Sequence, residues 1–395
     1  RRDRQVGDRD LRDASMAAWF QQQEGELGFD GVRDLRSAFQ LFDWVVRNID
    51  LEPGATSADG VPLAKRLSWE SLLVGRGDAW VRGRLFLLLC RQARIPALMI
   101  GREQPSQVTM PWAAAVWIQG RLYLFDPQLG LPIPAEQDRG IAYLAQLRNS
   151  PDLLRQLDVD GYPYPMVESD LTSLIGLSDG SIPYLSQRMR IVEDALPANQ
   201  RMVLSTAPSA LAAELRRSTQ LVGFELWTLH YDTLQHRPQM RDEQPAEYAV
   251  LQREVALFLE DTPLAAARRQ HFRGQYADDP PVQGAKSLYI ECRIPNADID
   301  RMTAADLARA YAQANGAAVQ VPPEFVEAAK VKARLTKQYA SFWLGIIGFE
   351  EGRPDVAIDY FRKRTLEAFP NGVWQQAATY NLARSLEALA EDDGD

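Results

Sequence analysis

The feature that most constrains the fold is a series of strong local signals between Gly75 and Pro127. Gly75-Arg76-Gly77 predicts a turn, and Asp78 is a suitable N-cap for the helix that follows it. Residues 85–89 make this helix apolar over much of its circumference, which is typical of a helix buried in a core. The surrounding chain must therefore cover this helix with other apolar elements.

Two or three strands are expected directly after this helix. Residues 97–100 form a short strand-like run behind Ile95-Pro96. Residues 112–118 and 121–125 read as two strands joined by Gln119-Gly120, and the glycine of this loop can adopt a positive φ. The pattern predicts a β-hairpin that ends at a proline.

The order of these elements resembles the transglutaminase-like fold, a relative of the papain-like cysteine proteases. The resemblance rests on Gly75-Arg76-Gly77, on Leu89-Cys90-Arg91 with Ile95-Pro96-Ala97, and on Tyr123-Leu124-Phe125-Asp126-Pro127. It implies a catalytic cysteine at the start of the helix, a histidine on one strand and an aspartate at the end of the next. In such a site a helix N-terminus and an imidazole lower the pKa of the thiol.

This chain departs from the family pattern at two of the three positions. The nucleophile position falls at Ala79, and the base position falls at or beside Pro111-Trp112, where there is no histidine. Of the expected three residues only Asp126 is present. The positions Ala79, Trp112 and Asp126 are therefore degenerate, and Trp112 is expected to plug the cleft or to line a binding groove.

Other residues could in principle supply chemistry. Cys90 lies about 16 Å along the same helix from Ala79, so it cannot replace the nucleophile and is expected to be a buried structural thiol. Asp78 and Asp126 could form a carboxylate pair with divided acid and base roles, although capping and turn closure are common structural uses of aspartate. The three histidines lie outside the transglutaminase-like segment, at positions 230, 236 and 271.

The C-terminal region is helical and Ala-rich. Leu344-Gly345, Ala357 and Phe361 fall at the spacing of a tetratricopeptide repeat, with Pro370 one place late. About one and a half repeats are present, fewer than the roughly three that make an independent solenoid. These helices must therefore lean on another domain or on a second chain.

Four large aromatic residues of this tail are the candidate binding residues: Trp343, Phe349, Phe361 and Trp374. Large aromatics bury much area at low entropic cost, so they are common anchors of protein partners. The alternative left open is that they only close the tail's own core against the α/β region.

The sequence predicts an α+β protein in five parts. Residues 1–34 are a solvated lead-in with a helix, 35–135 the transglutaminase-like domain, 136–165 a linker with a helix, 166–300 a small α/β domain and 301–395 the tetratricopeptide-like tail. In the α/β domain we expect strands at 202–205 and 221–229 around a helix that starts at Pro208. Further helices are expected at 169–177, 185–196 and 247–260.

Composition narrows the classes of partner. The net charge of −9 argues against a broad basic surface for nucleic acid, and no apolar run approaches the length of a membrane span. No metal or cofactor motif is present, and the two cysteines form no CxxC pair. The chain starts at Arg1 without methionine, which leaves open export or a membrane tether through a segment absent from this chain.

These observations lead to two hypotheses. The first is a catalytically inactive transglutaminase-like protein that acts as an interaction or scaffolding module, with a protein partner or self-association through the helical tail. The alternative is a hydrolase of amide bonds with a rearranged site or with the Asp78/Asp126 pair.

Overall fold

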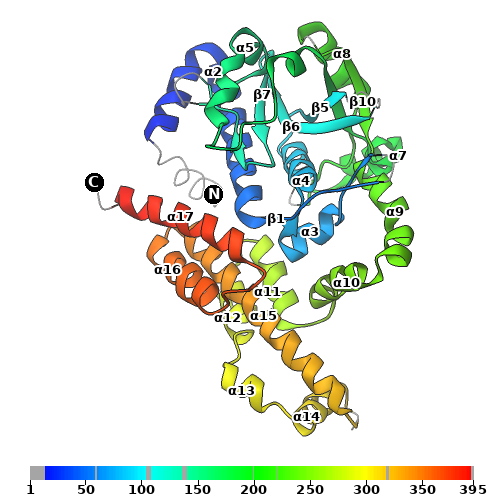
Figure 1. The fold of residues 1–395 in the computed structure, drawn as a ribbon, viewed down its shortest axis with the longest axis vertical. Coiled ribbons are helices and arrows are strands. Elements are labelled where there is room, and N and C mark those ends of the chain that lie inside the picture. Colours follow the sequence, from blue (N-terminus) through cyan, green and yellow to red (C-terminus); the bar gives the residue numbers. More distant parts are fainter. Residues whose placement is uncertain are drawn as a thin grey trace. The chain divides into compact units, whose positions relative to one another are not determined.

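A computed structural model describes residues 14–57, 60–103, 108–135, 140–198, 200–219, 221–316 and 320–392 of the chain. The expected Arg- and Asp-rich lead-in at 1–13 lies outside these residues. The contacts divide the chain into two compact units, Arg1–Tyr248 (unit 1) and Ala249–Asp395 (unit 2). Unit 1 combines helices with strands and unit 2 is helical in its described part, so the predicted α+β class with a helical C-terminal region is confirmed (Figure 1).

Unit 1 is built on a six-stranded sheet with the order β10-β9-β5-β6-β7-β8. The strands are β5 (Ala97–Glu103), β6 (Thr109–Ile118), β7 (Arg121–Asp126), β8 (Leu131–Pro132), β9 (Leu174–Asp179) and β10 (Gly223–Trp227). All neighbouring pairs are antiparallel except β9 and β10, which run parallel. Two short pairs lie outside this sheet: β1 (Asp50–Leu51) with β4 (Arg76–Gly77), and β2 (Ala55–Thr56) with β3 (Pro62–Leu63).

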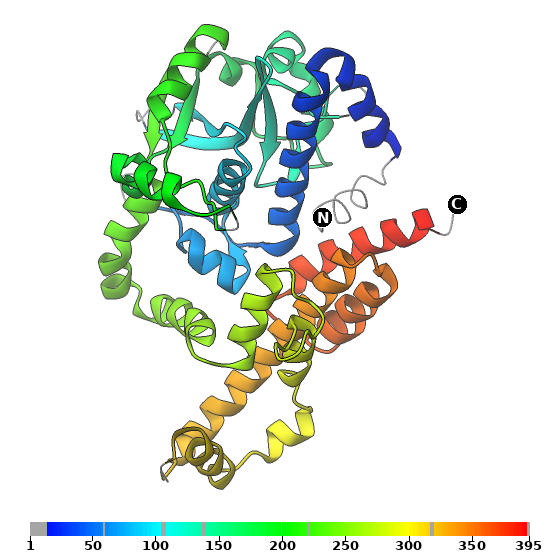
Figure 2. The same ribbon diagram turned by 180° about the vertical axis from the view of Figure 1, so that it is seen from behind.

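Helices cover both faces of this sheet (Figures 1 and 2). On one face, Phe42 of α2 (Ala14–Asn48) and Phe86 of α4 (Ala79–Gln92) pack against Phe125 of β7. On the other face, Leu124 belongs to a buried cluster with leucines of α5 (Leu144–Asn149) and α8 (Pro208–Ser218). Successive strand residues point to opposite faces, so neighbours such as 124 and 125 enter different cores.

The remaining elements of unit 1 connect or flank these layers. They are α3 (Ser68–Val74), the 3₁₀ helices Pro151–Leu157 and Glu168–Thr172, α6 (Ile182–Leu185), α7 (Gln187–Ala195) and α9 (Leu229–Glu243). Helix α10 (Pro245–Leu259) crosses the limit between the two units. The helices expected at 185–196 and 247–260 and the helix that starts at Pro208 are therefore confirmed.

The predicted hairpin is confirmed at its turn. Strands β6 and β7 are joined by Gln119 and Gly120, with φ values of 47° and 82°. Two successive residues with positive φ match the right-handed twist of the flanking strands, which is why glycine is favoured in such a loop.

Two predictions for the middle of the chain are wrong. Residues 174–179, placed mostly in a helix at 169–177, form the buried strand β9, and residues 202–205 form no strand. A short apolar run has no periodicity that separates a buried strand from a helix. The β-α-β unit exists, but it connects β9 to β10 within the main sheet.

Unit 2 consists of helices around an aromatic core. Its helices are α11 (Pro263–Phe272), α12 (Ala285–Glu291), α13 (Asn296–Arg301), α14 (Ala304–Asn315), α15 (Pro323–Glu350), α16 (Pro354–Asp359), a π-helix at Tyr360–Glu367 and α17 (Gln375–Asp392). Trp343 and Phe342 of α15 pack against Trp374, and the rings of Phe342 and Trp374 are stacked with centroids 4.1 Å apart. Their packing fastens the last helices to α15.

Gly345 lets the π-helix approach α15 closely. A Cβ atom at this position would lie 2.6 Å from the ring of Phe361, which is fully buried.

We expect Gly345→Ala to lower the free energy of unfolding of unit 2 by about 1–3 kcal/mol, because the new methyl group overpacks the core. Gly25→Ala is the matched control, since a Cβ at Gly25 meets nothing within 4 Å and alanine favours a helix by up to about 1 kcal/mol. Urea denaturation of the full chain measures both. Equal effects of the two substitutions would contradict the close contact.

Candidate functional site

The resemblance in the sequence places a nucleophile at the start of α4. Ala79 is the first residue of the helix, and the side chain of Asp78 caps it. One carboxylate oxygen of Asp78 accepts the N–H of Val81 at 2.8 Å, and the other accepts the N–H of Lys65 at 3.2 Å. Asp78 therefore holds the helix N-terminus, and Ala79 brings no reactive atom to it.

The positions of the base and the acid are joined by a residue that sequence reasoning did not select. The indole N–H of Trp112 donates to the hydroxyl oxygen of Tyr164 at 2.7 Å. The hydroxyl of Tyr164 in turn donates to a carboxylate oxygen of Asp126 at 2.5 Å. We call this hydrogen-bonded series the Trp112–Tyr164–Asp126 chain.

A β-bulge directs Trp112 into this arrangement. Ile100 of β5 pairs with Ala113, and the next residue, Gly101, pairs with Pro111, so Trp112 is the extra residue of β6. A bulge bends its strand and re-aims a side chain. Trp112 consequently packs against the cluster that contains Tyr164 and Ile100.

Asp126 is buried and fully engaged. Its other oxygen accepts the N–H groups of Gln128 at 2.7 Å and Leu129 at 2.9 Å, which closes the turn after β7. Burial raises the pKa of Asp126, and the bonds from Tyr164 and the two N–H groups oppose this rise. Burial and the neighbouring carboxylate also raise the pKa of Tyr164, so its hydroxyl keeps the proton that it donates.

Side-chain bonds hold the segment around Tyr164. The carboxylate of Asp158 accepts the N–H of Tyr164 at 2.7 Å, and the guanidinium of Arg155 donates to the carbonyl oxygens of Tyr164 and Met166. Residues 162–165 form the run Tyr-Pro-Tyr-Pro, in which proline marks turns. These contacts hold the run so that the hydroxyl of Tyr164 reaches Asp126 at the end of β7.

The proposed carboxylate pair is not joined in the structure. Burial raises the pKa of Asp78 to about 6, and the charged residue that adds to the rise is Glu52. The groups that act on the pKa of Asp126 are Tyr164, Gln128 and Leu129. Apart from burial, none of the groups named as shifting the pKa of Asp78 also shifts the pKa of Asp126.

A second buried polar cluster ties α4 to β9. The guanidinium of Arg84 donates to Asp179 at 2.9 Å and to the hydroxyl of Ser68 at 2.7 Å. Arg91 lies 3.6 Å from the same carboxylate and stacks on the ring of Tyr184. The buried charges of Arg84, Arg91 and Asp179 are therefore paired with one another, which is a structural role for a salt bridge.

The cysteine and the histidines lie in separate places. Cys90 is fully buried, and burial raises the pKa of its thiol well above the usual value. Burial and Arg84 lower the pKa of His230. The Nδ1 atom of His236 lies 2.9 Å from the carbonyl oxygen of Asp232. His271 is buried in unit 2, where its Nε2 lies 3.5 Å from Glu350.

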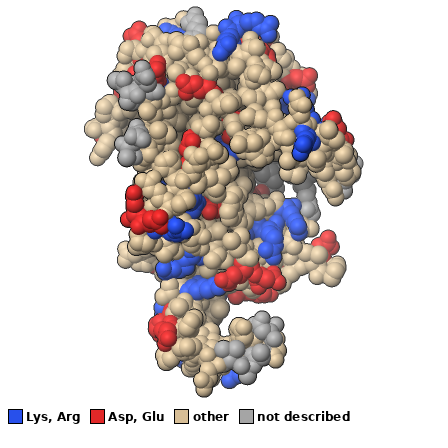
Figure 3. Space-filling view, turned by 90° about the vertical axis from the view of Figure 1, so that its right-hand side faces the viewer, with Lys and Arg blue, Asp and Glu red and all other residues tan. Residues whose placement is uncertain are grey.

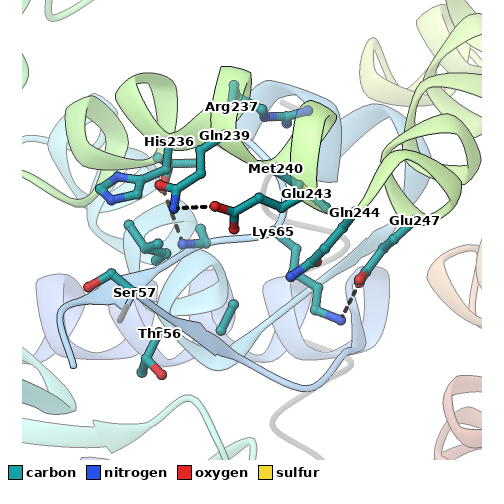
Figure 4. A pocket seen from close by; sticks show the side chains of 14 residues that line it. Thr56, Ser57, Lys65, His236, Arg237, Gln239, Met240, Glu243, Gln244 and Glu247 are labelled. Carbon is teal, nitrogen blue, oxygen red and sulfur yellow. Dashed lines mark hydrogen bonds and ion pairs between the residues drawn. The ribbon is translucent and has the colours of Figure 1, made fainter. Parts of the chain in front are cut away.

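A polar pocket of about 430 Å³ lies between the β2–β3 pair and α9 (Figure 4). Lys65 and Glu247 form an ion pair of 2.9 Å at its edge, and Gln239 donates to Glu243 at 3.0 Å. It is lined by Ala55, Thr56, Ser57, Leu63, Ala64, Lys65, Thr233, His236, Arg237, Gln239, Met240, Glu243, Gln244 and Glu247. The lining side chains offer hydroxyl and amide groups, and the ammonium group of Lys65 is already paired with Glu247.

Three of the four predicted tail anchors are buried. Trp343, Phe361 and Trp374 are each at most 1% exposed, and Phe349 is partly exposed. The three buried rings pack within the core of unit 2. The surface available to a partner is made by other residues of the unit.

Within the described ranges, no group of three or more histidine, cysteine or acidic residues is placed to hold a metal ion. None of the helices in these ranges combines the length and the apolar character needed to span a bilayer. On the face drawn in Figure 3, acidic and basic side chains occur side by side. Comparisons with models of protein families, with curated proteins and with solved structures found no match for this chain.

We predict that Tyr164→Phe lowers the free energy of unfolding by about 1–3 kcal/mol, because it removes the hydroxyl that pairs with one carboxylate oxygen of the buried Asp126 and with the indole N–H of Trp112. Tyr162→Phe is the matched control in the same loop, since Tyr162 is 79% exposed and should change stability by less than about 0.5 kcal/mol. Urea denaturation compares the two. If the two variants have the same free energy of unfolding, the Trp112–Tyr164–Asp126 chain contributes nothing to stability.

Asp78 should make stability depend on pH. Its pKa of about 6 in the folded state exceeds the ordinary 3.8, so folding takes up a proton between these values and this contribution falls as pH rises. Asp78→Asn removes the ionisation. The stability of the variant relative to wild type should therefore increase by about 1–3 kcal/mol between pH 4 and pH 8. A difference that stays constant over this range would refute the raised pKa.

Proposed function

We propose that this chain is a non-catalytic, transglutaminase-like protein that serves as an interaction or scaffolding module. The observation that carries the proposal is the Trp112–Tyr164–Asp126 chain together with Ala79 at the start of α4. A thiolate mechanism needs a nucleophile and a base within hydrogen-bond reach. Here the nucleophile position is a methyl group, the base position is an indole, and the carboxylate at the acid position is hydrogen-bonded to a phenol.

The order of elements supports the transglutaminase-like part of this proposal. A capped core helix is followed by antiparallel strands β5, β6 and β7, and Asp126 ends the last of them. This is the order on which the resemblance in the sequence rests. The missing cysteine and histidine then make the domain a pseudoenzyme.

A tetratricopeptide-like tail is the second part of the proposal. The close approach of Gly345 to Phe361 supports it, because the repeat needs a small residue where its two helices touch. Such helices commonly present surfaces to other proteins. We propose that unit 2 binds a protein partner or a second copy through its exposed residues.

The alternative function is hydrolysis of amide bonds with the Asp78/Asp126 pair. In its favour, the pKa of about 6 at Asp78 is close to what a general acid or base needs at neutral pH. Against it, both oxygens of Asp78 already accept backbone N–H groups. Loss of a measured hydrolase activity on Asp78→Asn, with the fold intact, would favour this alternative.

The proposal predicts an inert protein. We expect neither acyl transfer from a glutamine peptide to a primary amine nor hydrolysis of peptide amides above the uncatalysed rate. A thiol-directed probe should leave Cys90 unlabelled in the folded chain and label it after denaturation, since only the thiolate reacts. Labelling of the native Cys90 with loss of a measurable activity would overturn the inactive interpretation. Proteins that co-purify with the chain from its own cells would identify a partner.

A further inference from the structure

A small pocket of about 160 Å³ lies in unit 1 between α2, β7 and the start of α5 (Figure 1). Its walls include Trp19 and Glu26 of α2, Arg121 and Tyr123 of β7, and Tyr143 at the N-cap of α5. No member of the Trp112–Tyr164–Asp126 chain lines it, so the pocket is a separate site.

The hydroxyl of Tyr123 is a buried donor in this pocket. The residue is 0% exposed, and its hydroxyl proton has no acceptor among the described residues, since the neighbouring Arg121 can only donate. Burial raises the pKa of Tyr123, so the hydroxyl keeps its proton at neutral pH. Buried polar groups are almost always hydrogen-bonded, so a ligand with an acceptor oxygen suits this position.

The guanidinium of Arg121 adds further donors beside this hydroxyl. Its Nη1 donates to Glu26 at 2.7 Å, and its central carbon lies 4.9 Å from the centre of the Tyr143 ring. The side chain of Glu26 is 56% exposed, so this is a surface ion pair, which contributes little and can give way to a competing anion. Arginine binds a carboxylate best through two parallel hydrogen bonds.

The charges already present favour an anionic ligand over a cationic one. Aromatic rings such as the three in this pocket can bind an ammonium ion through their faces. Arg121 already occupies the cation position over Tyr143, so a second cation would be repelled. The side-chain amides of Gln23 and Gln146 also line the pocket and can donate to an anion.

The size of the pocket and its apolar wall define the rest of the ligand. A cavity of about 150 Å³ holds one benzene molecule, so this pocket has room for about one aromatic ring. The indole of Trp19 forms an apolar wall and rests against the backbone of Gly140, where a Cβ atom would lie 2.1 Å from the indole ring. A planar ring can pack on this indole while its charged group reaches Tyr123 and Arg121.

We propose that this pocket binds a small aromatic carboxylate. The carboxylate accepts hydrogen bonds from the hydroxyl of Tyr123 and from the guanidinium of Arg121, where it takes the place of Glu26. The ring of the ligand packs on the indole of Trp19. This ligand site goes beyond the proposed scaffolding role, and neither depends on the other.

Isothermal titration of the full chain with benzoate tests the proposal. Wild type should bind one benzoate with a Kd of about 1 mM or below. Benzamide has the same shape without the charge, so it should bind about tenfold more weakly, because hydrogen bonds to a charged acceptor are the stronger ones. Benzylammonium, the cationic probe, should not bind.

Single substitutions assign the binding to the named groups. Tyr123→Phe removes one hydrogen bond to the carboxylate and should weaken benzoate binding about tenfold, and Arg121→Gln should abolish saturable binding. Glu26→Gln should instead strengthen binding about threefold, because it removes the competing carboxylate and its repulsion. Arg33→Gln is the matched control, since it also removes an exposed ion pair of α2 but lies outside the pocket, and it should leave binding unchanged.

Several results would contradict the proposal: no saturable benzoate binding to wild type at millimolar concentration, equal binding of benzoate and benzamide, or weaker binding by Glu26→Gln. Binding of benzylammonium in place of benzoate would show a cation site and would contradict it as well. Glu26 lies on the surface, so its substitution leaves the fold intact and decides the question even if Arg121→Gln does not fold.

Discussion

A carboxylate buried at the end of a strand needs hydrogen-bond donors, and this constraint organises unit 1. Asp126 is 3% exposed, and the cost of burying an unpaired charge would be several kcal/mol. Two backbone N–H groups and the phenol of Tyr164 supply the donors. Tyr164 therefore fixes the loop after the hairpin, and it is itself fixed by Trp112 on the neighbouring strand.

The same physical rule shapes the helical unit. Arg268 is fully buried, and its guanidinium stacks on the ring of Trp343 at 4.1 Å. His271 lies between this cation and Glu350, and burial lowers its pKa, which favours the neutral imidazole. Buried aromatic rings of the tail thus surround polar groups inside unit 2.

The sequence alone predicts the parts of the site that depend on local chemistry. Asp78 caps the helix that it precedes, and Gln119-Gly120 can be recognised as a turn because their conformational preferences are local. The contact between Tyr164 and Asp126 spans 38 residues, and that between Arg84 and Asp179 spans 95. No local pattern encodes such distant pairs, so neither was predicted.

Short apolar segments mark the other limit of sequence reasoning. The strand β9 is buried along nearly its whole length, so it lacks the alternation that distinguishes a strand from a helix. The tail aromatics show the same ambiguity, since core residues and partner anchors are chosen from the same large apolar side chains. The burial of Trp343, Phe361 and Trp374 in the folded unit distinguishes the two roles.

The inactive interpretation depends most directly on the Trp112–Tyr164–Asp126 chain, because the resemblance in the sequence places a catalytic base and its orienting acid at Trp112 and Asp126. Exchange of the Trp112 indole proton with solvent, followed by NMR with Trp112→Phe used to assign the signal, measures it. The account predicts that this proton is protected in the wild type and exchanges faster in Tyr164→Phe, with the sheet amides unchanged. If this proton exchanges in the wild type at the rate of an exposed indole, the Trp112–Tyr164–Asp126 chain does not form.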